Sequence, residues 1–133
     1  MINLSDIVKA SVSRANRWHP GGLEEWSALE WAGATAGEAG EACNAAKKLK
    51  RLQTNLQHVE KRSEVVVEEE SYKDQVAKEA ADTILYALLL MVRVNRDPEL
   101  IIASVFNATS ESYEFPERLN VQCDCPIHRD DHK

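Results

Sequence analysis

Two pairs of carboxylates are the part of the sequence best suited to chemistry. Glu38 and Glu41 form one pair, and Glu79 and Asp82 form another later in the chain. Residues three apart on a helix differ by about 60° in rotation, so each pair projects from one face. Two facing helices would direct four negative charges at one volume, where they repel unless a cation joins them. Carboxylate oxygens suit a hard ion, so the pattern predicts a site for Mg²⁺, or for Mn²⁺ in its place.

The competing interpretation of each pair is a solvated helix face, where glutamate is common. Glu38 and Glu41 lie in the segment AGATAGEAGEA, whose glycines and alanines would allow another helix to come close. Gly37 and Gly40 each weaken a helix by roughly 1 kcal/mol relative to alanine, so helix propensity does not explain them. Asp82 directly precedes the apolar segment ILYALLLMV, where a half-buried carboxylate without a partner is costly. The surroundings therefore favour the metal site.

Basic and aromatic residues accompany both pairs. Asn44, Lys48 and Arg51 follow the first pair along one helical stripe, where the cations suit the phosphates of a triphosphate. A basic helix end that complements the helix dipole explains the two cations equally well. Tyr86 projects close to the second pair and could stack on a base, although a tyrosine among leucines is more often core.

Apolar spacing and helix-breaking residues predict an all-α chain with four helical segments. They cover residues 4–16, 23–52, 72–95 and 98 to just before Phe115. Asn3 or Ser5 would cap the first segment, and Asp97 followed by Pro98 is typical of a helix start. The third segment is apolar nearly all round, so we expect it to be buried, with a second copy of the chain supplying the missing cover.

Residues 53–71 are charged and weakly periodic, so we expect a connecting excursion there. The three valines at 65–67 fit either a short strand or a turn of helix.

Residues 1–119 are expected to form one domain and residues 120–133 a flexible tail. The tail contains four residues that zinc would accept as ligands, Cys123, Cys125, His128 and His132. Their spacing is not that of a standard finger, so incidental cysteines and histidines are favoured.

The composition fits one globular domain without disulfide bonds. The chain has 133 residues, of which 44% are hydrophobic, and a net charge of −6. This charge argues against a nucleic-acid-binding surface but not against a small polyphosphate that binds with a cation. The three cysteines are an odd number, no signal peptide is visible, and the apolar run at 84–92 is too short for a bilayer. We therefore expect a cytoplasmic protein that binds neither nucleic acid nor membrane.

The two pairs and their surroundings resemble the all-α NTP pyrophosphatase superfamily, which includes MazG, dimeric dUTPases, dCTP pyrophosphatases and phosphoribosyl-ATP pyrophosphatase. The family pattern is an E-x-x-E pair followed by an E-x-x-D pair on a later helix. Here it reads GEAGEACNAAKKLKR and KEAADTILY. The similarity extends to WHPGGLEEWSALEWA and FNATSESYEFPERL, as in phage and mobile-element members, and covers most of residues 18–119.

The resemblance implies a four-helix, MazG-like bundle completed by oligomerisation, as a homodimer or homotetramer. It implies Mg²⁺-assisted attack of water on the α-phosphorus of a (d)NTP, which gives a (d)NMP and pyrophosphate for nucleotide-pool control. By position, the metal ligands and catalytic residues would be Glu38, Glu41, Glu79 and Asp82, one of which also polarises the water. Lys48 and Arg51 match phosphate-binding positions, and Tyr86 matches an aromatic residue near the base.

Other residues are candidates for substrate contacts. Trp18, Trp26 and Trp31 could line a nucleobase pocket, with core packing as an equally good explanation. Where many members carry a basic residue near the end of the fourth helix, Asn107 and Arg118 are the nearest substitutes.

The alternative function is a catalytically silent helical oligomer that acts as an interaction or regulatory module. The intact set of four carboxylates disfavours it.

Overall fold

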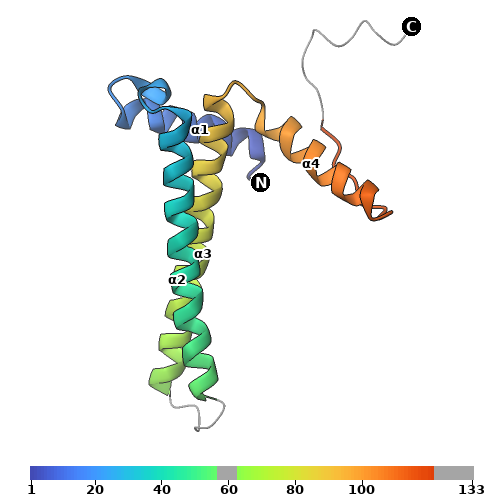
Figure 1. The fold of residues 1–133 in the computed structure, drawn as a ribbon. Coiled ribbons are helices and arrows are strands. Elements are labelled where there is room, and N and C mark those ends of the chain that lie inside the picture. Colours follow the sequence, from blue (N-terminus) through green and yellow to red (C-terminus); the bar gives the residue numbers. More distant parts are fainter. Residues whose placement is uncertain (57–62, 122–133) are drawn as a thin grey trace, which may run out of the picture. The chain divides into compact units, whose positions relative to one another are not determined.

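A computed structural model of the chain describes residues 1–56 and 63–121, and this part is helical with no strand (Figure 1). The elements are α1 (Leu4–Trp18), the 3₁₀ helix η1 (Gly22–Glu25), α2 (Ala28–Leu56), α3 (Ser63–Arg93) and α4 (Pro98–Ser112). They belong to two units, one over Met1–Asn95 and a second that begins at Arg96. The predicted all-α class is confirmed.

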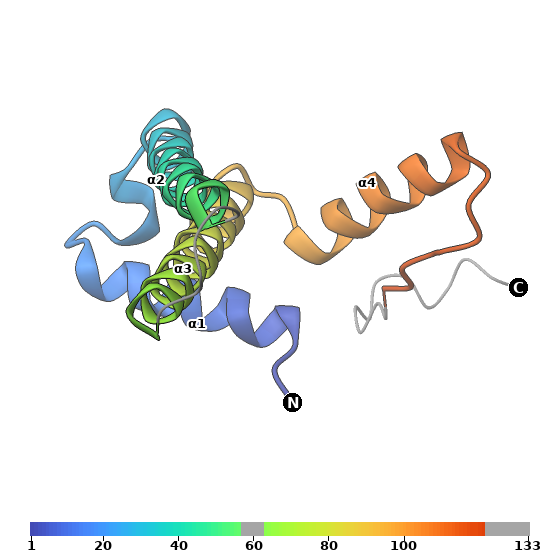
Figure 2. The same cartoon turned by 90° about the horizontal axis from the view of Figure 1, so that it is seen from below.

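The long helices α2 and α3 form an antiparallel hairpin, which is the frame of the first unit. Seen along its axis, the two helices lie side by side and α1 lies across α3 (Figure 2). Within the single chain the apolar segment of α3 is covered only in part, and the predicted cover by a second copy stays a prediction. Leu88 and Leu89 are buried, whereas Ile84 is 58% exposed, because α2 and α1 cover only part of the circumference of α3.

The link between α1 and α2 is a tight turn followed by η1, not the start of one long helix over residues 23–52. Gly22 has a φ of 68°, and a Cβ there would lie 2.8 Å from Oδ1 of Asn16. The same oxygen accepts a hydrogen bond from the backbone N–H of Leu23 at 2.8 Å. The side chain at the end of α1 therefore holds the turn in place and separates the two helices.

A capping box starts α2 and explains why the helix does not begin earlier. The Ser27 hydroxyl oxygen accepts the backbone N–H of Glu30 at 3.2 Å, and the Glu30 carboxylate accepts the backbone N–H of Ser27 at 2.7 Å. The bond from the Ser27 backbone N–H, followed by one that the Ser27 hydroxyl donates to the same carboxylate at 2.9 Å, lowers the pKa of Glu30. The Ser-x-x-Glu spacing is readable in the sequence, so this boundary was predictable.

Residues 53–56 and 63–71 are helical, so the predicted excursion is wrong for these positions, and residues 57–62 lie outside the described part of the chain. α2 extends to Leu56 and α3 begins at Ser63, and the three valines are part of α3. The two helices are joined here by polar contacts, such as the hydrogen bond from Gln53 Nε2 to Glu69 Oε1 at 3.1 Å. The apolar periodicity is weak because this end of the hairpin has no core to fill.

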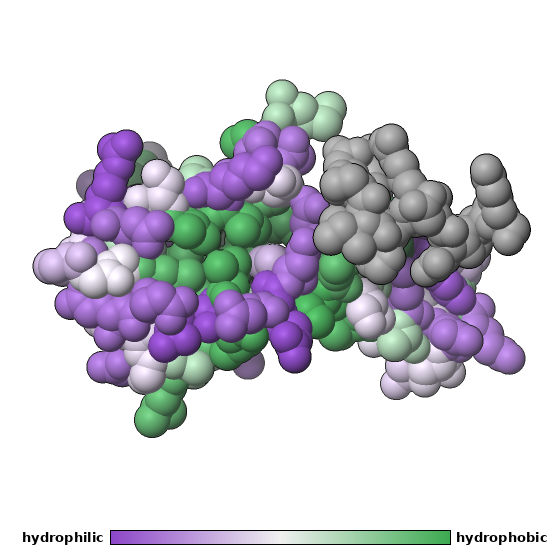
Figure 3. All heavy atoms as spheres, turned by 90° about the horizontal axis from the view of Figure 1, so that it is seen from above, coloured by the Kyte–Doolittle hydropathy of each residue, from purple (hydrophilic) through white to green (hydrophobic). Residues whose placement is uncertain are grey.

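The apolar core lies at the other end of the hairpin, where α1 and η1 pack. Each of the four elements contributes one buried residue to it, and these are Ala15, Leu23, Trp31 and Leu89. Trp31 is 1% exposed, and its indole N–H donates to the carbonyl of Leu23 at 3.1 Å. Figure 3, which looks onto this end, shows hydrophobic residues (green) gathered between hydrophilic ones (purple). This core fixes α1 against the hairpin.

The second unit contains α4 and the segment that follows it. Asp97 caps α4 through its carboxylate, which accepts the N–H of Glu99 at 2.8 Å, and Pro98 occupies the first turn, as predicted. The predicted tail with its four zinc-ligand candidates lies outside the described residues, except for its first two positions. None of the helices in residues 1–56 and 63–121 combines the length and hydropathy of a membrane span.

Candidate functional site

Three of the four predicted carboxylates meet between α2 and α3. Glu38, Glu41 and Glu79 each offer a carboxylate oxygen, and these oxygens lie within 4.8 Å of one another. Two come from one helix at i,i+3 spacing, and the third comes from the antiparallel neighbour. The hairpin thus brings together residues that are about 40 positions apart in the sequence.

The three carboxylates differ in their exposure and charge. Glu79 is 5% exposed, Glu38 is half-buried and Glu41 is exposed. Partial burial raises the pKa of Glu38 above its ordinary value of 4.5, and the negative charges of the neighbouring carboxylates raise it further. A hydrogen bond with Glu79 acts in the same direction. The neighbouring negative charges therefore favour a proton or a cation at Glu38.

Asp82, the fourth predicted ligand, lies one turn from Glu79 on α3 and is paired with a lysine. Lys78 Nζ lies 2.8 Å from Asp82 Oδ2 and 3.2 Å from Glu79 Oε2. The hydrogen bond to Asp82, followed by that to Glu79, raises the pKa of Lys78. Its side chain is 66% exposed, so this ammonium can leave the carboxylates for solvent at little energetic cost.

A cavity of about 240 Å³ opens beside Glu38 and Asp82. α1 and the turn after it form one wall, and α2 and α3 form the other. The side chains that line it are Ser11, Arg14, Ala15, Trp18, His19, Trp31, Glu38, Asp82, Leu85, Tyr86 and Leu89. The cavity thus has aromatic walls next to two carboxylates, which suits a flat ring attached to a charged group.

Of the predicted base-contacting residues, the structure brings Trp18, Trp31 and Tyr86 to the cavity. Trp18 is 66% exposed, whereas Trp31 is part of the core and presents only an edge of its surface. Trp26 is absent from the lining residues. Its ring packs 4.7 Å from that of Trp31 and 4.7 Å from that of His19, so it supports the wall from behind.

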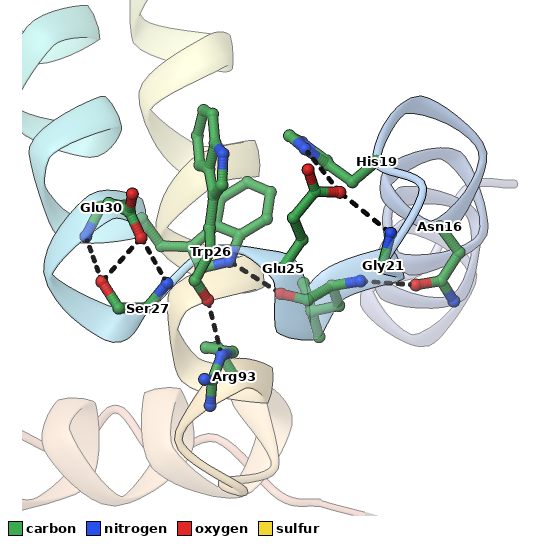
Figure 4. A network of polar contacts seen from close by, with 10 residues as sticks. Asn16, His19, Gly21, Glu25, Trp26, Ser27, Glu30 and Arg93 are labelled. Carbon is green, nitrogen blue, oxygen red and sulfur yellow. Dashed lines mark hydrogen bonds and ion pairs between the residues drawn. The ribbon is translucent and has the colours of Figure 1, made fainter.

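Polar contacts hold these aromatic rings in place (Figure 4). Arg93, at the end of α3, donates through Nε to the carbonyl of Trp26 at 2.8 Å. Its guanidinium also lies 3.1 Å from the carboxylate of Glu24. The Glu25 carboxylate accepts the N–H of Gly21 at 3.0 Å and lies 3.9 Å from His19 Nδ1. Arg93 therefore links η1 to α3, and with them the aromatic wall to the carboxylate helix.

The predicted phosphate-binding residues of α2 lie away from the cavity. Asn44, Lys48 and Arg51 are exposed, and none of them lines it. With a rise of about 1.5 Å per residue, Lys48 lies about 10 Å and Arg51 about 15 Å beyond Glu41 along the helix. Arg51 instead lines an open groove with other residues near the end of α2.

The small residues around the first carboxylate pair do not mediate close helix contact within the chain. A Cβ at Gly33, Gly37 or Gly40 would meet no other atom within 4 Å. The expectation that these glycines pack against a neighbouring helix is therefore wrong for one chain, because α3 packs on another face of α2.

Asn107, a predicted substrate contact, lies in the second unit. Its amide donates to the carbonyl of Leu119 at 3.0 Å and accepts the N–H of Leu119 at 2.8 Å. Arg118 donates to the carbonyls of Phe115 and Glu117. Both side chains thus stabilise the segment that follows α4.

Sequence reasoning missed three ionisable residues of the site, Arg14, His19 and Lys78. Lys78 was detectable, because it is adjacent to Glu79 and four residues before Asp82, the spacing of a helical ion pair. Arg14 and His19 were not, because their place at the cavity depends on how α1 packs across the hairpin.

The carboxylates fit a hard divalent cation. Oxygen ligands lie about 2.1 Å from Mg²⁺, so two of them on opposite sides of the ion are about 4.2 Å apart. Oxygens of Glu38, Glu41 and Glu79 within 4.8 Å of one another need only small side-chain rotations to reach that geometry. The exposure of Glu41 also leaves room for water, which Mg²⁺ usually retains.

Comparisons of this chain with protein-family models, with curated proteins and with solved structures found no match.

Proposed function

We propose that this chain is a Mg²⁺-dependent nucleoside triphosphate pyrophosphohydrolase of the all-α, MazG-like type, which converts a (d)NTP to a (d)NMP and pyrophosphate in nucleotide-pool control. One observation carries the proposal. Three carboxylates from two helices offer oxygens within 4.8 Å of one another, beside a cavity of about 240 Å³ with aromatic walls. The resemblance of the two carboxylate motifs to that superfamily supports the same reaction.

In this proposal the cation is held by four carboxylates, those of Glu38, Glu41, Glu79 and Asp82. Lys78 gives up its contacts with Glu79 and Asp82 when the cation binds. A cation held there would supply positive charge to the phosphates and would lower the pKa of a water bound to it. Glu38, which lies at the edge of the cavity, accepts the proton of the water as its oxygen bonds to the α-phosphorus. The bond from that phosphorus to the bridging oxygen breaks, and pyrophosphate leaves with the electron pair.

The aromatic residues position the nucleoside. The side chains of Tyr86 and Trp18 line the cavity. Every nucleobase has a flat face that can stack on an aromatic ring. The core behind them, anchored by Trp31, keeps the wall rigid so that the α-phosphate stays near the carboxylates.

Oligomerisation is part of the proposal. Ile84 and Leu29 are 58% and 81% exposed, and the glycine face of α2 is open. A second copy packed on these surfaces would cover them and complete a four-helix, MazG-like bundle from two hairpins. It would also provide a route by which Lys48 and Arg51 of one copy approach the site of another.

The alternative is a catalytically silent helical oligomer. The Lys78 contacts favour it, because they neutralise part of the charge of Glu79 and Asp82 without a metal. They leave Glu38 and Glu41 without a cation, however, so the pyrophosphohydrolase remains our proposal.

The test is pyrophosphate release from a panel of NTPs and dNTPs with Mg²⁺, with the nucleoside monophosphate identified as the second product. Glu41→Gln should reduce turnover roughly 100-fold or more, because even the loss of groups behind a metal ligand reduces activity 10–100-fold. Glu68→Gln is the matched control, since Glu68 is an exposed carboxylate at the other end of the hairpin. Turnover without Mg²⁺, no turnover at all, or equal rates in both variants would contradict the proposal.

A further inference from the structure

Arg14 is a cation at the cavity that none of the sequence motifs indicated. It lies on α1, and it is the one lysine or arginine among the described side chains that line the cavity. Two carboxylates, those of Glu38 and Asp82, also line the cavity. The cavity therefore has carboxylates suited to a cation on the wall formed by α2 and α3, and a positive side chain on the opposite wall formed by α1.

The neighbourhood of Arg14 leaves its hydrogen-bond donors available. Its Cζ lies 5.0 Å from the ring centre of Trp18, one turn further along α1. A guanidinium held over an indole keeps the N–H groups at its edge free to donate. Within residues 1–56 and 63–121, no carboxylate lies at ion-pair distance from Arg14. The side chain is thus held by stacking, and its charge has no partner in this part of the chain.

The other cations near the carboxylates are less suited to a ligand in this cavity. Lys78 does not line the cavity, and without a bound cation its ammonium lies against Asp82 and Glu79. Lys48 lies about 15 Å and Arg51 about 20 Å beyond Glu38 along the axis of α2, at a rise of about 1.5 Å per residue. A triphosphate brings several negative charges to a site that already has four carboxylates, so it needs positive charge in addition to the metal.

We propose that Arg14 binds a phosphate group of the nucleotide substrate through paired N–H groups and orients it toward the carboxylates. This inference rests on the proposed function and names a substrate-binding residue for it. A planar guanidinium matches two phosphate oxygens at once, which a lysine does not. The contact is to a phosphate, so its contribution is the same whichever base the nucleotide carries.

The test compares Arg14→Ala with Arg17→Ala in the full-length protein. Arg17 is an exposed arginine on the same helix and lines a different groove, so it is a matched control. Arg14→Ala should raise KM for each nucleotide at least tenfold, equivalent to about 1.4 kcal/mol, and change kcat less. Arg14→Lys should recover part of the loss, whereas Arg17→Ala should leave KM unchanged. Thermal melts of all variants should agree with that of the wild type.

A binding experiment separates this inference from the proposed function. Calorimetry with Mg²⁺ and a non-hydrolysable NTP analogue should show at least tenfold weaker binding to Arg14→Ala than to Arg17→Ala. If the wild type binds the analogue but turns over no nucleotide, the proposed reaction is wrong, and a selective loss in Arg14→Ala still supports the phosphate contact. No binding to the wild type, equal affinities in the two variants, or a loss that occurs with one base only would overturn the assignment of Arg14.

Discussion

The two ends of the α2–α3 hairpin contain the same kinds of residue in different surroundings. At the α1 end, Glu38 and Asp82 line an aromatic cavity that shares Ala15, Trp31 and Leu89 with the apolar core. At the other end, Glu69 and Glu70 lie 3.6 Å and 2.7 Å from the ammonium of Lys73, and their side chains are 13% and 61% exposed. The hydrogen bond to Glu70 is the main reason that the pKa of Lys73 is raised.

The difference shows that spacing alone does not identify a site. Glutamates at i,i+3 or i,i+4 intervals occur at both ends, and exposed pairs such as those of Lys73 contribute about 0–1 kcal/mol each. The α1 end differs because three carboxylates from two helices lie within 4.8 Å of one another, and desolvation followed by the neighbouring negative charges raises the pKa of Glu38. Natural proteins tolerate such uncompensated charge mainly where a ligand uses it.

The largest effect on stability is expected from the core of the α1 end. Trp31→Ala should lower the free energy of unfolding by about 3–5 kcal/mol, because it removes a fully buried ring that contacts α1, η1 and α3. Tyr72→Ala, a half-buried aromatic at the other end, should lower it much less. Urea unfolding of both variants makes the comparison. Equal losses would show that the two ends are alike in packing.

A smaller, pH-dependent effect on the melting temperature is expected for Glu38→Gln and not for Glu68→Gln. Since the pKa of Glu38 is raised above 4.5, its contribution to stability is present below pH 4.5 and is lost as the pH rises through the raised pKa. Glu38→Gln mimics the protonated form. In EDTA the variant should therefore melt at the wild-type temperature in acid and at a higher temperature at neutral pH, and Mg²⁺ should remove the difference.

Glu68→Gln is the control for this series, because Glu68 is exposed and remote from the carboxylate site. It should follow the wild type at every pH. If the difference in melting temperature between Glu38→Gln and the wild type were the same at every pH, the interpretation of Glu38 as a carboxylate with a raised pKa would be contradicted.

Much of this comparison could be predicted from the sequence, and the failures have physical causes. The existence of four helices, the caps at Asn3 and Asp97, and the i,i+3 spacing of each carboxylate pair follow from local patterns. The meeting of Glu38, Glu41 and Glu79 depends instead on how α2 packs against α3. The helical nature of residues 63–71 did not follow, because polar pairs rather than an apolar stripe join the helices there. Helix formation without a core leaves little periodicity to detect.

The cavity was beyond sequence reasoning because it is made by tertiary packing. Arg14 and His19 reach it only because α1 lies across the hairpin, and that placement depends on the core around Trp31. Trp26 has the same residue type as Trp31 and lies five positions before it, yet it supports the wall instead of lining it. The role of each aromatic residue is set by the turn through Gly22, which no propensity scale encodes.

Titration calorimetry with Mg²⁺ tests most directly whether the α1 end of the hairpin is a metal site. The wild type and Glu68→Gln should each bind the ion in a saturable manner, and Glu41→Gln should bind it at least tenfold more weakly, the loss expected when a carboxylate ligand becomes a neutral amide. Titrations with Mn²⁺ should give the same order. No saturable binding to the wild type, or equal affinities in Glu41→Gln and Glu68→Gln, would contradict a metal site formed by Glu38, Glu41 and Glu79.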